Sequence, residues 1–102
     1  MAVKIQTDGA VMTAFLSGDI DHHSAASMRE SIDSAVERCR PALLVLDFSG
    51  VGFMDSSGVG LIMGRFRLIK ELGGNLDIKG ASPAAAKMIK LAGLERLGIK
   101  AK

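Results

Sequence analysis

The sequence contains no tryptophan and no tyrosine, so its four phenylalanines are its only large aromatic residues. Proteins that bind single-stranded nucleic acid stack bases on several exposed aromatic rings. Here the rings mostly lie inside apolar segments: Phe15, Phe48, Phe53 and Phe66. The chain also has no run of five or six like charges of the kind that forms a nucleic-acid or membrane patch. We therefore expect no direct binding of nucleic acid.

Cysteine and long apolar runs are equally scarce. Cys39 is the only cysteine, which excludes an internal disulfide and a cysteine-based zinc site and fits a reducing compartment. It falls on the apolar stripe of a predicted helix, where we expect a buried and inert thiol. Apolar stretches such as residues 42–46 are far shorter than the ~20 residues that span a bilayer, and the start of the chain lacks the apolar segment of a secretion signal. We expect a cytoplasmic protein that does not associate with membranes.

What the chain does have fits one soluble domain. Its 102 residues, 48% hydrophobic and 24% charged, are enough for one hydrophobic core, so we predict a single domain over residues 1–102. The net charge of +2 is unevenly distributed. Residues 1–55 carry four basic and eight acidic side chains, whereas residues 56–102 carry nine basic and three acidic ones. Such polarity can orient a partner protein, although solvated surfaces explain it more simply.

The first half of the chain predicts a hairpin and a helix. Apolar, β-prone runs flank Asp8-Gly9, a pair typical of a tight primed turn in which both central residues have positive φ. Ser24 is then expected to cap a helix, which Pro41 ends. The apolar positions of this helix follow the three-four spacing of one face: Ala25, Met28, Ile32, Ala35, Val36 and Cys39.

The middle of the chain predicts a buried strand followed by a helix. Residues 42–48 form a continuous apolar run, typical of a central strand. After a short connection over residues 49–53, a helix is expected to continue to about Leu72 and to end at the positive-φ pair Gly73-Gly74. Its apolar stripe contains Val59, Ile62, Phe66 and Ile69, while three basic side chains are expected to point largely elsewhere: Arg65, Arg67 and Lys70.

The last part of the chain repeats the alternation. Residues 75–80 predict a strand, Ser82-Pro83 predicts the start of a helix over residues 84–92, and residues 97–101 predict a short edge strand. Strands that alternate with helices after an initial hairpin indicate the α/β class. We expect a mixed, mostly parallel sheet of four to five strands, an N-terminal β-hairpin and three or more helices, with right-handed crossovers.

Asp55, Ser56 and Ser57 are the strongest candidates for chemistry, and a serine hydrolase is the first alternative to consider. A nucleophile elbow has the pattern Gly-x-Ser-x-Gly, and only half of that pattern is present here. A serine nucleophile also needs a base that an acid orients, and the only histidines are the adjacent pair His22 and His23. We therefore do not expect an enzyme.

A metal or nucleotide site is equally unsupported. Asp19 and Asp21 lie near the two histidines, but adjacent histidines point in different directions, and no further His or Cys pair completes a coordination sphere. The chain has no Gly-Lys-Ser or Gly-Lys-Thr phosphate loop, and its glycines fail the dinucleotide spacing. We expect no metal and no cofactor.

Two interpretations of Asp55, Ser56 and Ser57 remain: a helix cap, and a phosphorylation site that another protein modifies. They precede a helix, where a side chain can accept the unpaired backbone N–H groups of the first turn. A cap needs one such residue, whereas three occur, and the small Gly58 and Gly60 leave the Ser57 hydroxyl accessible. A phosphate there adds about −1.5 to −2 charge, which a helix N-terminus favours by ~0.3–1 kcal/mol. The same charge inside an interface can cost several kcal/mol, so phosphorylation can switch binding without unfolding.

Two motifs, GDIDHHSA at residues 18–25 and FMDSSG at residues 53–58, occur together. With them the sequence resembles the bacterial anti-sigma factor antagonists of the STAS domain family, especially the sporulation type. The similarity covers nearly the whole chain and implies the STAS fold.

The resemblance also implies roles for individual residues. The second serine of the family's Asp-Ser-Ser-Gly motif is the phosphoacceptor, which corresponds to Ser57. The aspartate of the Asp-His-His motif contacts the partner kinase, which corresponds to Asp21, and we expect its replacement to affect partner binding and not the fold. Three further residues flank Ser57 on the implied recognition surface: Asp55, Ser56 and Gly58.

The implied mechanism is partner switching. The unphosphorylated protein binds an anti-sigma factor that is also a serine/threonine kinase and supplies the ATP, so the sigma factor is released. The kinase then phosphorylates Ser57, the complex separates, and a PP2C-type phosphatase restores the serine. The alternative within the same family is a scaffold or adaptor subunit of another signalling assembly, in which the serine is regulatory but the partner is not an anti-sigma kinase.

Overall fold

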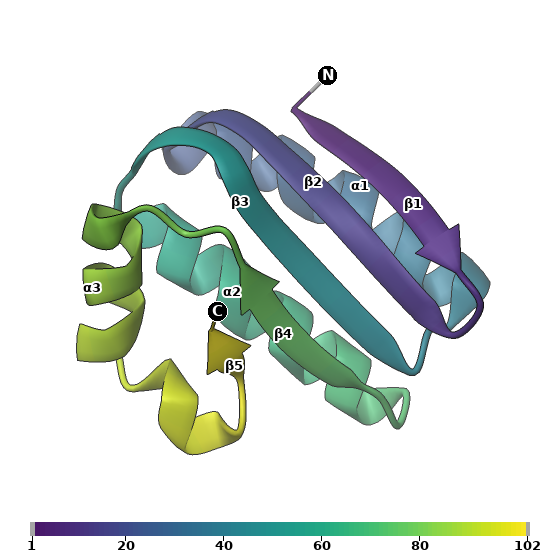
Figure 1. Ribbon diagram of the computed structural model, residues 1–102. Helices are drawn as coiled ribbons and strands as arrows, with labels where there is room; N and C mark the ends of the chain where they lie inside the picture. Colours follow the sequence, from purple (N-terminus) through teal and green to yellow (C-terminus); the bar gives the residue numbers. More distant parts are fainter. Residues whose placement is uncertain (1, 102) are drawn as a thin grey trace.

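The computed structural model describes residues 2–101, which form a five-stranded sheet with helices packed on one face (Figure 1). The elements in chain order are β1 (Val3–Asp8), β2 (Val11–Ile20), α1 (His22–Cys39), β3 (Leu43–Met54), α2 (Ser56–Glu71), β4 (Asn75–Lys79), α3 (Pro83–Leu91), the 3-10 helix η1 (Leu94–Leu97) and β5 (Lys100–Ala101). The strands lie in sequence order, with β1 antiparallel to β2 and all other pairs parallel. The predicted α/β fold with an N-terminal hairpin and a mostly parallel sheet is confirmed.

The turn of the hairpin lies one residue later than predicted. Asp8 pairs with Val11, so Gly9 and Ala10 are the central residues. Gly9 has a φ of +60°, and the only described non-glycine residue with positive φ is Arg40. This combination matches a type II′ turn, in which only the first central position needs positive φ. The prediction of two positive-φ residues at Asp8-Gly9 was therefore wrong.

Helix α1 begins at an aspartate and not at the predicted Ser24. The Asp21 carboxylate Oδ1 accepts hydrogen bonds from the backbone N–H groups of His23 and Ser24, both at 2.9 Å. The Ser24 hydroxyl in turn accepts the Asp21 N–H at 2.9 Å. These reciprocal bonds form a capping box. Ser24 is thus the third residue of the helix, because Asp21, three positions earlier, is the N-cap.

Cys39 was predicted to be buried, and this prediction was wrong because the thiol is exposed. The buried side chains of α1 end at Val36, whereas Cys39 is the last residue of the helix and is followed by Arg40 in the left-handed conformation. Three-four spacing determines the face on which a residue lies, but not how far along the helix axis the core extends.

Strand β3 is longer than the predicted residues 42–48. The segment expected to be a connection, residues 49–53, continues the strand and pairs with the end of β2, although two register shifts interrupt the ladder. Glycine is depleted in strands, but pairing with a neighbouring strand overrides that preference. As a result, Ile20 at the end of β2 lies beside Met54 at the end of β3.

Helices α1 and α2 cover one face of the sheet, and α3 lies beside the β4–β5 edge (Figure 1). The core lies between this face and the helices, and its largest fully buried side chains are Met12, Leu16, Ile20, Met28, Ile32, Leu44, Leu46, Phe48, Ile62, Ile69, Leu76 and Ile78. Arg65 was expected to point away from the core, but only 6% of it is exposed. Its side chain is buried because an acidic group on α1 pairs with it.

The end of α2 and the start of α3 agree largely with the sequence. Gly73 has the predicted positive φ of +84°, but Gly74 does not and is instead buried. A side chain there would collide with the Pro41 carbonyl oxygen. Ser82 caps α3 as predicted, since its hydroxyl accepts the Ala85 N–H at 3.1 Å. Within residues 2–101, no helix combines the length and apolar character needed to cross a membrane.

Candidate functional site

The candidate site lies where two helices begin next to each other. Parallel strands β2 and β3 end side by side, and the Asp55 N–H donates a hydrogen bond to the Ile20 carbonyl at 3.1 Å. Asp21 follows β2 and Asp55 follows β3, so the two aspartates hold equivalent positions in adjacent strand–helix connections. Residues 34 positions apart in the sequence therefore meet at one end of the sheet.

Asp55 caps α2, which leaves the serines free of that role. Its carboxylate Oδ1 accepts the Ser57 N–H at 2.8 Å. Ser56, the first residue of the helix, is exposed, and Ser57, the second, is half-buried. No hydrogen bond joins the Ser57 hydroxyl to another residue in the described part of the chain. Of the three candidate caps in the sequence, only Asp55 is the N-cap.

Gly58 brings α2 close to the strand before it. The residue is buried, and a Cβ atom at this position would collide with Cγ and Sδ of Met54. Next to Met54, Phe53 leaves 56% of its surface exposed. The glycine thus allows the helix to start directly against β3, at the strand end that also carries this exposed ring.

The Asp21 carboxylate is held in its ionised form. Its pKa lies below the ordinary aspartate value, chiefly because the Ser24 backbone N–H donates a hydrogen bond to it; the nearby charge of His23 contributes less. The side chain is exposed, so the negative charge faces solvent at the same end of the sheet as Ser57. The five residues of the predicted recognition surface therefore lie at the same end of the sheet, where α1 and α2 begin: Asp21, Asp55, Ser56, Ser57 and Gly58.

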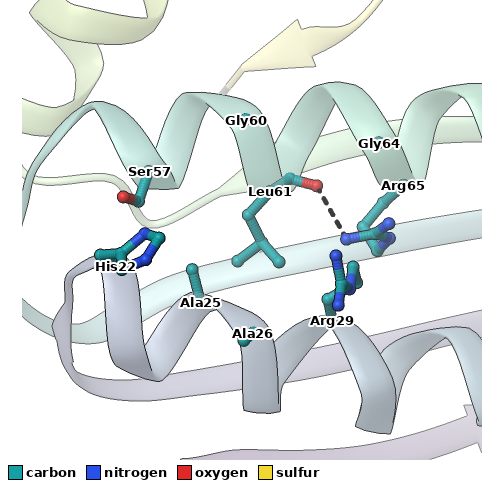
Figure 2. A pocket seen from close by; sticks show the side chains of 9 residues that line it. All are labelled: His22, Ala25, Ala26, Arg29, Ser57, Gly60, Leu61, Gly64 and Arg65. Atoms are coloured by element: carbon teal, nitrogen blue, oxygen red, sulfur yellow. Dashed lines mark hydrogen bonds between the residues drawn. The ribbon is translucent and has the colours of Figure 1, made fainter.

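A cavity of about 310 Å³ separates α1 from α2 (Figure 2). Ser57 and His22 lie at one end and point toward one another, and Arg29 and Arg65 lie at the other. Small residues line the middle: Ala25, Ala26, Gly60 and Gly64. Sequence reasoning treated His22 as a surface residue. The parallel pairing of β2 with β3 was the signal that could have placed it near Ser57.

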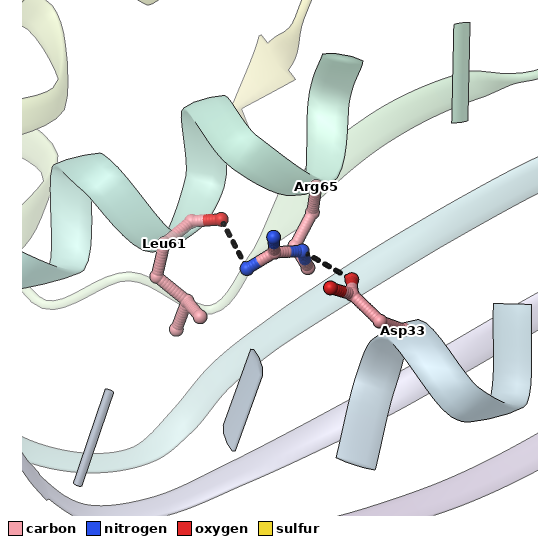
Figure 3. A network of polar contacts seen from close by, with 3 residues as sticks. All are labelled: Asp33, Leu61 and Arg65. Carbon is pink, nitrogen blue, oxygen red and sulfur yellow. Dashed lines mark hydrogen bonds and ion pairs between the residues drawn. The ribbon is translucent and has the colours of Figure 1, made fainter. Parts of the chain in front are cut away.

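An ion pair ties the two helices together beyond the cavity (Figure 3). Arg65 Nε lies 2.6 Å from Asp33 Oδ1, and Arg65 Nη1 donates to the Leu61 carbonyl at 3.4 Å. Burial lowers the pKa of Arg65 and raises the pKa of Asp33, with the attraction between the two charges opposing both shifts. Arginine stays charged in proteins, so the pair fixes α1 against α2.

Ser57 is not part of a hydrogen-bonded triad in the described part of the chain. His22 shares its cavity, but no hydrogen bond joins the two side chains among the described residues. The Asp21 carboxylate accepts backbone N–H groups and does not orient the His22 ring. A base oriented by an acid, which activates a serine nucleophile, is not assembled. Within residues 2–101 no group of three or more His, Cys, Asp or Glu side chains is arranged to hold a metal ion.

Comparison with known proteins gives a consistent result. The model of the STAS domain matches residues 2–100. The anti-sigma F factor antagonist of Paenibacillus polymyxa is 31% identical over 97 residues, which cover 95% of this chain and 83% of that protein.

Two solved structures show the same fold. The anti-sigma factor antagonist SpoIIAA in its unphosphorylated form superposes with a TM-score of 0.83 at 27% identity, covering 99% of this chain and 88% of that one. The Bacillus cell fate determinant SpoIIAA in the phosphorylated form gives a TM-score of 0.76 at 27% identity, with 99% and 91% covered. The fold is thus similar to SpoIIAA in both states.

Proposed function

Because the chain belongs to the STAS domain family, we propose that it is an anti-sigma factor antagonist that phosphorylation of Ser57 switches off. The unphosphorylated protein binds an anti-sigma factor that is also a serine/threonine kinase, and the sigma factor is released. The chain is a binding module and a substrate, and not an enzyme. A PP2C-type phosphatase restores the unmodified serine.

The transfer step uses only the hydroxyl of this chain. Ser57 Oγ forms a bond to the γ-phosphorus of ATP, the bond from that phosphorus to the β–γ bridging oxygen breaks, and ADP leaves. The hydroxyl proton passes to a base of the kinase. ATP and its metal ion belong to the partner, so the chain itself needs no cofactor.

The observation that carries this proposal is the uncommitted hydroxyl of Ser57. Asp55 already caps α2, so the Ser57 hydroxyl can be modified without the loss of a cap. It is half-buried at the mouth of an open cavity, where a partner's active site can reach it. The names of the relatives support the same class of function.

The partner surface that we propose consists of Asp21, Asp55, Ser56, Ser57 and Gly58. Phosphorylation would add about −1.5 to −2 charge beside two carboxylates. In the docked complex the dianion lies beside the carboxylates of Asp21 and Asp55. Like charges brought together in an interface cost several kcal/mol, which is enough to separate the complex.

The test is to incubate the protein with ATP and the candidate anti-sigma kinase and to locate the phosphate by mass spectrometry. We expect modification at Ser57, its loss in Ser57→Ala, and its retention in the matched control Ser56→Ala, because Ser56 is the exposed neighbour. Phosphate confined to Ser56 or to another residue would disprove the site. Labelling of Ser57 by a fluorophosphonate probe would instead support an enzyme.

A further inference from the structure

His22 is the ionisable side chain at the Ser57 end of the cavity between α1 and α2 (Figure 2). Its ring and the Ser57 hydroxyl point toward one another from the first turns of the two helices. His22 is exposed and makes no hydrogen bond that would fix its ring to another described residue. A group attached to the Ser57 oxygen therefore extends toward this imidazole.

We propose that His22 binds the phosphate of phosphorylated Ser57 within the same chain. The inference rests on the proposed function, since it requires Ser57 to be the modified residue. A histidine ring changes its charge between pH 5 and 8, and its protonated form donates a charge-assisted hydrogen bond to a phosphate oxygen. The contact is thus strongest when the ring is protonated and the phosphate is a dianion.

The two arginines of the cavity lie at its other end, opposite Ser57 (Figure 2). Arg29 is seven residues beyond His22 on α1, roughly 10 Å along the helix axis. Arg65 is eight residues beyond Ser57 on α2, roughly 12 Å away, and is already paired with Asp33. Among the residues that line the cavity, His22 is the basic side chain next to Ser57.

Two carboxylates lie near the position of the phosphate. They would repel it, and neither forms a hydrogen bond with the His22 ring. Asp21 on the α1 side accepts the backbone N–H groups of His23 and Ser24. Asp55 on the α2 side accepts the N–H of Ser57. Both carboxylates would repel a phosphate, so a phosphate at this position gains from a nearby positive charge. His22 lies on the facing helix, and its protonated ring would supply that charge.

His23 provides a matched control. Its ring centroid lies 5.9 Å from that of His22, so the two residues share almost the same environment. His23 does not line the cavity, and its charge acts on Asp21 instead. Replacing His23 changes the local charge as much as replacing His22 does, but leaves the contact with the phosphate in place.

The experiment measures the phosphate directly. Phosphoserine is installed at position 57 during translation, without any kinase, and its 31P resonance is followed as a function of pH. The second ionisation of a free phosphoserine has a pKa of about 6. We expect the midpoint in the otherwise unchanged protein to lie at least about half a unit below that in His22→Gln, a modest shift because the site is open to solvent. His23→Gln should behave like the parent.

Equal midpoints in the parent and in His22→Gln would overturn the inference, as would an equal shift in His23→Gln. Thermal unfolding of each variant shows that it is folded before the titration; both histidines are exposed, so neither change removes core packing. The outcome is separate from that of the kinase assay. Modification at another residue defeats the proposed function, whereas modification at Ser57 with unchanged midpoints defeats this inference alone.

Discussion

Asp21 and Asp55 each combine two tasks in one carboxylate. Both accept backbone N–H groups at the start of a helix, and both belong to the surface that we propose for the partner. The expectation that Asp21 can be replaced without effect on the fold did not include the capping box, whose bonds indicate some loss of stability on replacement. Mutations that aim to test binding must therefore preserve the cap.

We predict that Asp21→Ala lowers the thermal unfolding midpoint by a few degrees, whereas Asp21→Asn keeps the midpoint close to that of the parent protein. Asparagine caps a helix nearly as well as aspartate, and alanine cannot cap. Circular dichroism during heating measures both. If the two variants melt together, the cap contributes nothing to stability, and any loss of partner binding in either variant can be assigned to the interface.

The charge of Asp21 makes a separate, pH-dependent prediction. Since its pKa in the folded protein lies below the ordinary value, the ionised carboxylate stabilises the fold at pH values above the unfolded pKa of about 3.9. This stabilisation is lost as the pH falls through the folded pKa. The difference in unfolding midpoint between the parent and Asp21→Asn should be present at pH 6 and shrink as the pH falls through the folded pKa. A difference that grows on acidification would contradict the assignment.

Gly58 allows a sharp comparison of two glycines in the same helix. In Gly58→Ala the new methyl group must displace the buried Met54 side chain, and overpacking of this kind costs about 1–3 kcal/mol. At Gly60 a Cβ meets nothing within 4 Å, so Gly60→Ala should raise the free energy of unfolding by about 0.5–1 kcal/mol through lower backbone entropy. Urea denaturation measures both changes. Equal effects would mean that Met54 moves without cost.

Between the elements, the Arg65–Asp33 pair joins α1 to α2 behind the cavity (Figure 3). Asp33→Ala should lower the free energy of unfolding by about 3 kcal/mol, because it leaves a buried arginine without its counter-charge. The double variant Asp33→Ala, Arg65→Met should recover part of this loss, since methionine needs no partner. Urea denaturation measures the free energy of unfolding of both variants. A double variant less stable than Asp33→Ala would contradict the claim that the unpaired arginine causes the loss.

The elements themselves were largely predictable. Long periodic segments and turn residues gave the order of strands and helices, and Ser82 identified the start of α3. The missed details depend on contacts distant in sequence. Residues 49–53 extend β3 only because β2 pairs with them, and Arg65 is buried only because Asp33 faces it from another helix. The secondary-structure preferences of single residues indicate neither the extension of β3 nor the burial of Arg65.

At the scale of the whole molecule, the position of the candidate site depends on the order and direction of the strands. The two motifs identified Asp21 and Ser57, but their proximity follows from parallel strands that end side by side. The predicted parallel strands could have placed His22 near Ser57, but the cavity could not be read from the sequence, because it depends on the distance between α1 and α2. The small residues at the centre of the cavity and the ion pair behind it determine that distance.

The central claim is that phosphorylation of Ser57 switches partner binding while the fold persists. Isothermal titration calorimetry of the candidate anti-sigma kinase against the unmodified protein and the protein with phosphoserine at position 57, with a non-hydrolysable ATP analogue, tests it most directly. We predict that phosphorylation raises Kd more than tenfold, or by more than ~1.4 kcal/mol, with thermal unfolding nearly unchanged. Equal affinity for both forms, or loss of the fold on phosphorylation, would contradict the account.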